Sequence, residues 1–164
     1  FHFFSKKYIL LKHFNSMAAD IIILLYIIGI FIAIAFWEAY IEGSGGWAAN
    51  QVGWRINFGV GFLRRPLDAY HFWSWIVMIP AFLMLPFVMF GFNLHLFWLV
   101  VMGLLLGTII EDFLWFVVNP AFPFKDFNPK KVWWHYWIGF GKFKVPEIYV
   151  VYPVLALLVW IYLL

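Results

Sequence analysis

Four apolar runs constrain this chain more than any other feature, because each approaches the length of a lipid bilayer crossing. They cover residues 18–40, 69–92, 94–118 and 148–164. A helical crossing takes about 20 residues. A chain with 66% hydrophobic and 12% charged residues also has more apolar surface than one soluble core can bury. The sequence therefore predicts an all-α, polytopic integral membrane protein, with about four transmembrane helices in one domain over residues 1–164.

Two polar loops, residues 41–68 and 119–147, separate the runs, and four crossings would place both on one membrane face. In the second loop Asn128 precedes Pro129, an order typical of a helix cap and first turn. We therefore expect a short interfacial helix over residues 130–138. Its tryptophans, Trp133, Trp134 and Trp137, would suit the depth of the lipid head groups.

Basic residues are concentrated on the loop face, where all three arginines and five of the eight lysines lie. The positive-inside rule then predicts cytoplasmic loops, and we expect a plasma-membrane location. Lysines in the N-terminal segment favour the opposite orientation. The basic residues are dispersed near membrane ends, so we expect the bilayer and bound lipid as partners and no nucleic acid. The absence of cysteine excludes disulfides and thiolate metal sites.

An acidic pair, Glu111 and Asp112, interrupts the run 94–118, which has no other charged residue. A charge inside a membrane-spanning helix costs roughly 2.5–3.5 kcal/mol on insertion scales, and such residues usually face a bundle interior or a water-filled cavity. Gly103, Gly107, Glu111 and Trp115 follow at intervals of four and share one helix face. Because small residues permit close helix approach, this face is predicted to pack inward and to carry Glu111 with it.

Two interpretations of this pair remain open. In the first, Glu111 and Asp112 belong to a site for a proton, a metal or a lipid head group. In the second, they form ion pairs with Arg55, Arg64, Arg65 or a loop lysine and fix a loop to the bundle. Buried ion pairs do not have to be stabilising, since desolvation can exceed the Coulombic gain.

Other potential metal ligands are expected on the same membrane face. Glu38 and Glu42 end the first run, His71 begins the second, and His135 lies in the second loop. Carboxylates and imidazoles can bind Mn²⁺, Fe²⁺ or Zn²⁺, so a divalent metal is a possible cofactor. The candidate ligands are Glu38, Glu42, His71, Glu111, Asp112 and His135. No recognised metal-binding spacing such as Glu-x-x-His is present, and solvated helix-end acids with interfacial histidines are the alternative.

The three arginines, Arg55, Arg64 and Arg65, are candidates for holding a lipid phosphate. Their alternative role is a positively charged anchor beside a membrane entry.

Three functions fit these patterns. The favoured one is a non-catalytic accessory or structural subunit of a larger membrane complex, or a homo-oligomer. The second is a small membrane enzyme acting on a lipid or lipid-linked substrate, with Glu111, Asp112 and His135 as catalytic candidates. The third is a component of proton or ion transport. The enzyme hypothesis predicts an enclosed polar pocket that contains these groups.

Overall fold

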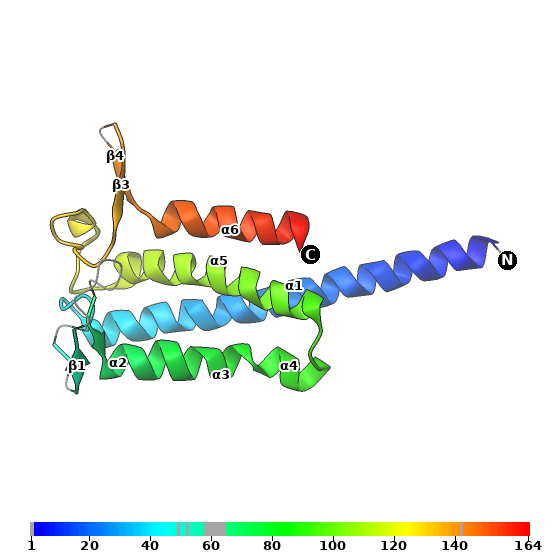
Figure 1. The fold of residues 1–164 in the computed structure, drawn as a ribbon, viewed down its shortest axis with the longest axis horizontal. Helices are drawn as coiled ribbons and strands as arrows, with labels where there is room; N and C mark the ends of the chain where they lie inside the picture. Colours follow the sequence, from blue (N-terminus) through cyan, green and yellow to red (C-terminus); the bar gives the residue numbers. More distant parts are fainter. Residues whose placement is uncertain (1, 49, 52, 58–64, 142) are drawn as a thin grey trace.

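The computed structural model describes residues 2–48, 50–51, 53–57, 65–141 and 143–164; for residues 2–16 and for Phe140 it describes the backbone alone. Helices α1 (His2–Glu42) and α5 (Leu94–Val118) lie side by side. A segmented helix flanks α1, and α6 (Ile148–Tyr162) packs along α5 (Figure 1). The N-terminal part of α1 extends beyond the other helices.

The second apolar run is broken into short helical segments. They are α2 (Ala69–His71), a π-helical segment η1 (Phe72–Met78), α3 (Ile79–Leu83) and α4 (Leu85–Phe90). Pro80 and Pro86 each lie in the first turn of a segment, where their missing N–H costs no helical hydrogen bond. The two prolines therefore lie where one helical segment gives way to the next. Asn93 then caps α5, accepting a hydrogen bond from the Leu96 N–H at 2.8 Å.

Within the residues that the structure describes, three stretches are long and apolar enough to cross a membrane: Met17–Glu42, Ala69–Phe90 and Leu94–Val118. These correspond to the first three predicted crossings. The predicted fourth crossing is not confirmed, because α6 has 15 residues and spans only about 22 Å at about 1.5 Å per residue. The apolar core of a bilayer is about 30 Å thick.

The glycine face of α5 packs against α1, as the spacing predicts. A Cβ atom at Gly103 would lie 2.8 Å from Ile27 Cδ1, and one at Gly107 would overlap the Phe31 ring. Ile27 and Phe31 are fully buried in the main apolar core. Glu111 and Trp115 continue this face and are also buried. The packing of these α1 side chains onto the α5 glycines therefore brings Glu111 to the α1 side of the bundle.

The predicted interfacial helix over residues 130–138 is wrong. Asn128 does form a turn, since its Oδ1 accepts hydrogen bonds from the N–H groups of Lys130 and Lys131. The chain then forms an antiparallel hairpin of β3 (Trp137–Phe140) and β4 (Phe143–Pro146). Gly141 has a φ of +61°, which glycine adopts without steric cost. The remaining loop elements are the pair β1 (Arg55–Ile56) and β2 (Leu67–Asp68) and the 3₁₀ turn η2 (Phe124–Asp126).

Tertiary packing explains why the first turn after Asn128 does not extend into a helix. Val132 and Trp134 are buried in a second apolar cluster at the loop end of the bundle. Other members of that cluster are Ala39, Trp115, Phe116 and Phe122. These contacts outweigh the weak preference of a short segment for helix.

Candidate functional site

A polar cavity of about 230 Å³ lies at the loop end of the bundle, where the end of α1, the start of α2, the last third of α5 and the start of α6 meet. It is walled in part by aromatic rings, including those of Trp75, Trp115 and Phe116. The ionisable side chains that line it are Glu38, Glu42, Arg65, His71, Glu111, Asp112, His135 and Tyr152. All six candidate metal ligands from the sequence, and all three catalytic candidates, therefore face one cavity.

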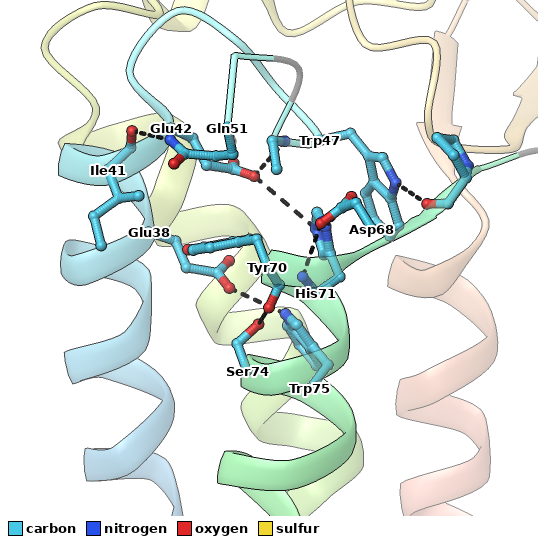
Figure 2. Close-up of polar contacts among 12 residues, drawn as sticks. Glu38, Ile41, Glu42, Trp47, Gln51, Asp68, Tyr70, His71, Ser74 and Trp75 are labelled. Carbon is cyan, nitrogen blue, oxygen red and sulfur yellow. Dashed lines mark hydrogen bonds and ion pairs between the residues drawn. The ribbon is translucent and has the colours of Figure 1, made fainter. Parts of the chain in front are cut away.

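Glu38 and Glu42 enter the cavity from successive turns of α1. Figure 2 shows both carboxyl groups directed towards the start of the second run, where Tyr70, His71 and Trp75 lie. Glu38 Oε1 accepts a hydrogen bond from Trp75 Nε1 at 3.1 Å. Glu42 Oε1 accepts one from the Ala48 N–H at 2.6 Å. Each carboxyl group is thus held in place by one N–H donor.

Glu111 is different, because it is buried and its hydrogen-bonding neighbour is another carboxyl group. Its side chain lies within hydrogen-bonding reach of the Glu38 carboxyl group, and only 5% of the residue is exposed. Among the described residues, no arginine or lysine lies within ion-pair distance of it. The interpretation in which Glu111 forms an ion pair with Arg55 or Arg65 is therefore not supported by the described contacts; Arg64 lies outside the described residues. Two such close carboxyl groups need a proton or another cation between them.

His71 is oriented by an aspartate that precedes it by three residues. Asp68 caps α2: Oδ1 accepts from the His71 N–H at 2.9 Å, and Oδ2 lies 2.8 Å from His71 Nδ1. The contact with Oδ2 assigns the proton to Nδ1. His71 Nε2 then faces Glu42 Oε1 at 3.9 Å (Figure 2), beyond a direct hydrogen bond. His71 therefore presents an unprotonated nitrogen next to a carboxyl group in the cavity.

A stack of planar groups supports this histidine. The His71 ring lies 3.9 Å from the Trp47 ring at an interplanar angle of 16°, and the Arg65 guanidinium lies 4.8 Å from the Trp47 ring. Trp47 Nε1 donates a hydrogen bond to the Pro66 carbonyl at 2.9 Å. The indole thus fixes the loop segment that precedes α2 and positions both Arg65 and His71.

His135 has both ring nitrogens occupied. Nε2 lies 2.9 Å from Asp112 Oδ1, and Nδ1 lies 3.4 Å from Arg65 Nη2. Because Arg65 can only donate, Nδ1 is the acceptor and Nε2 carries the proton given to Asp112. Asp112 Oδ2 also accepts from the Tyr149 hydroxyl at 2.6 Å. Asp112 and His135 therefore form a closed set of contacts that ends at Arg65.

Arg65 is the described arginine that lines the cavity. Burial lowers the pKa of its guanidinium, while the nearby acids Glu147 and Asp112 act in the opposite direction. An arginine nevertheless keeps its charge at neutral pH. Among the described residues, no carboxylate lies within ion-pair distance of Arg65. Arg55 serves the loop instead: it donates to the Ala48 carbonyl at 2.6 Å and lies 4.0 Å from Asp68.

Two buried donors at this end of the bundle have no hydrogen-bond partner among the described residues. They are the Tyr70 hydroxyl and Trp115 Nε1. The Trp115 indole lines the cavity and points towards the Glu42 carboxyl group, but it lies outside hydrogen-bonding geometry. An unpaired buried donor costs about 1–3 kcal/mol. At the cavity, Trp115 Nε1 is therefore a donor that could bind an acceptor on a ligand.

No group of three or more histidine, aspartate and glutamate side chains is arranged to hold a metal ion in the part of the chain that the structure describes. Glu42 Oε1 and His71 Nε2 both face the cavity at 3.9 Å from each other. They are the pair that a divalent cation bound in the cavity would use first.

Sequence reasoning missed three residues that organise the site: Trp47, Asp68 and Tyr149. The Asp68-x-x-His71 spacing at the start of an apolar run was a usable signal, because an aspartate at a helix cap reaches the residue three positions later. Trp47 and Tyr149 reach the site only through the fold.

No protein-family model, curated protein or solved structure matches this chain.

Proposed function

We propose that this protein is a small membrane enzyme that performs acid–base chemistry on a lipid or lipid-linked substrate in the polar cavity. The observation that carries the proposal is His71, whose Nε2 faces the cavity next to Glu42 while Asp68 holds Nδ1. A nucleophile or acid–base group backed by an orienting carboxylate is a recurrent catalytic arrangement.

The arrangement of contacts suggests a division of roles. His71 Nε2 is the group that takes a proton from the substrate or returns it, and Asp68 positions the ring. Glu42 and Glu111 offer carboxyl groups to the same space. Asp112 and His135 act indirectly, because their polar atoms bind each other, Tyr149 and Arg65. Arg65 is suited to a phosphate, which its planar guanidinium can bind through two N–H groups.

The position of the cavity supports a substrate from the membrane. It lies at one end of three apolar helices that fit a membrane location, at the end where both polar loops fold over the bundle. A lipid head group would enter at this depth while its chains stay in the bilayer. We also propose that the protein lies in the plasma membrane with both loops in the cytoplasm, which the excess of basic residues in these loops supports.

An accessory-subunit function is the second proposal, and a separate feature favours it. An apolar cavity of about 270 Å³ lies between the α1 and α4 parts of the apolar helices. It shares no lining residue with the polar cavity. Its lining consists of Ala19, Ile22, Ile23, Tyr26, Leu85, Pro86, Met89 and Phe90. A partner helix would fill it. A native mass well above that of one 19.5 kDa chain in mild detergent would support this function, and a monomer in every mild detergent would contradict it.

The enzyme proposal is tested by comparing lipids after expression of the wild-type chain and of His71→Gln. Untargeted lipid mass spectrometry on host membranes should reveal at least one lipid class that the wild-type protein converts. Loss of a general acid or base slows a reaction by about 10²–10⁴-fold, so His71→Gln should abolish the change.

His95→Gln is the matched control. His95 also contacts an aspartate, Asp20, at 3.0 Å, but it does not line the polar cavity. The control should behave as wild type. A wild-type protein that changes no lipid, or a His71→Gln variant as active as wild type, would contradict the proposal.

A further inference from the structure

The acidic side of the cavity lacks positive charge. Glu38, Glu42 and Glu111 line it together, and the first two each receive one hydrogen bond, from Trp75 and from the Ala48 N–H. Glu111 is 5% exposed, and its side chain lies within hydrogen-bonding reach of the Glu38 carboxyl group. Two carboxyl groups in such contact need a proton or another cation between them, so a ligand that brings N–H groups and positive charge would satisfy both.

A positively charged residue, Arg65, lines the same cavity and forms no ion pair with a carboxylate of a described residue. Arg65 contacts His135 at 3.4 Å and the face of Trp47, and no carboxylate of a described residue is within ion-pair distance. Glu111 and Arg65 therefore share a cavity of about 230 Å³ without pairing with each other. A guanidinium held over an indole keeps its N–H fork available for a phosphate.

We propose that the cavity binds a zwitterionic phosphoethanolamine group, with the primary ammonium at Glu111, Glu38 and Glu42 and the phosphate at Arg65. This inference rests on the proposed function and names the substrate class as an amine-bearing phospholipid. A primary ammonium carries three N–H donors, which the carboxyl groups lack. A quaternary choline ammonium has none and cannot replace them.

The test is a calorimetric titration of the full chain in mild detergent with short-chain phospholipids that differ only in the head group. Dihexanoyl phosphatidylethanolamine should bind at least about tenfold more tightly than dihexanoyl phosphatidylcholine or dihexanoyl phosphatidylglycerol, because only it combines a phosphate for Arg65 with ammonium N–H donors for the carboxyl groups. Glu111→Gln should remove this preference. Arg65→Gln should weaken binding of all three lipids by about tenfold.

His95→Gln, at the other end of the bundle, is the control and should bind as wild type does. Equal wild-type affinity for the three lipids would overturn the inference, and that measurement does not depend on any variant folding. A Glu111→Gln variant that is folded by circular dichroism and keeps the ethanolamine preference would also overturn it. If water-soluble phosphoethanolamine binds as tightly as the lipid, the inference that the bound group belongs to a phospholipid would be overturned.

Binding and turnover fail separately. Selective ethanolamine-lipid binding without any lipid conversion would contradict the enzyme proposal and support the head-group site. Conversion of a lipid without an amine, dependent on His71, would support the enzyme proposal and overturn the head-group site.

Discussion

At the residue scale, the two cavity histidines differ in whether a ring nitrogen is left without a hydrogen-bond partner among the described residues. His71 gives Nδ1 to Asp68 and leaves Nε2 facing Glu42 at 3.9 Å. His135 binds Asp112 through one nitrogen and Arg65 through the other. An imidazole with both nitrogens occupied cannot also exchange a proton with a substrate without losing a contact. His71 is therefore the better acid–base candidate, and His135 is a positioning residue for Arg65.

Backbone strain is also concentrated beside His71. Trp47 and Ala48 adopt φ values of 58° and 47°, a left-handed conformation that side-chain-bearing residues seldom take. Strained residues of this kind cost about 1–3 kcal/mol each and cluster at functional sites. Two hydrogen bonds hold this segment. The Ala48 N–H donates to Glu42, and the Ala48 carbonyl accepts from Arg55. Local strain thus places the Trp47 ring against His71.

Asp112→Asn is predicted to destabilise the protein. Asp112 accepts hydrogen bonds from His135 and Tyr149 with both oxygens, and an amide would replace one acceptor by a donor. The free energy of unfolding should fall by about 1.5–3 kcal/mol, as for hydrogen bonds to charged groups. Denaturant unfolding in detergent measures it. Asp20→Asn removes a more exposed Asp–His contact and should cost at most about 1 kcal/mol; equal losses for both would contradict the prediction.

At the element scale, the α1–α5 contact sets the geometry of the acidic side. Ile27 and Phe31 of α1 occupy the space that side chains at Gly103 and Gly107 would take. Glu38 lies two turns beyond Phe31, and Glu111 lies one turn beyond Gly107. The approach of the two helices at the glycines therefore brings the two carboxyl groups together.

Gly107→Ala is predicted to separate these helices. The new Cβ atom would overlap the fully buried Phe31 ring, and overpacking of this kind costs about 1–3 kcal/mol. The midpoint of thermal unfolding in detergent should fall. Gly29→Ala is the control: it lies in α1 with nothing within 4 Å of the new Cβ atom, and alanine should stabilise the helix by up to about 1 kcal/mol. Equal responses of the two variants would refute close packing at Gly107.

At the scale of the whole molecule, both loops lie at one end of the helices, away from the 91–93 connection (Figure 1). Asn119 links them: its Nδ2 donates to the Gly43 carbonyl at 2.8 Å, and its Oδ1 accepts from the Ala121 and Phe122 N–H groups. Trp134 also packs against Gly46, where any side chain would overlap its ring. The cavity is therefore covered by two loops that bind each other.

Topology can be tested cleanly because the chain has no cysteine. Single cysteines at the exposed positions Ser44 and Lys130 should react with a membrane-impermeant maleimide from the same side of sealed vesicles. A cysteine at Phe92, which is 73% exposed in the structure, should react from the other side. Leu163→Cys reports on α6. If α6 completes a fourth crossing, this cysteine should react with the maleimide from the same side as Phe92→Cys. Labelling of Ser44→Cys and Lys130→Cys from opposite sides would contradict the shared loop face.

Sequence reasoning alone was enough to predict three apolar helices of membrane-spanning length and the inward face of α5 that carries Glu111. These follow from local properties: the length of an apolar run and a spacing of four residues. Tertiary contacts alone explain three other features. They are the hairpin of residues 137–146, the Asp68–His71 and Asp112–His135 contacts, and the absence of an ion pair between Glu111 and Arg55 or Arg65. Each depends on which distant side chains meet at the loop end of the bundle, where burial and hydrogen bonding outweigh the local preference of a short segment.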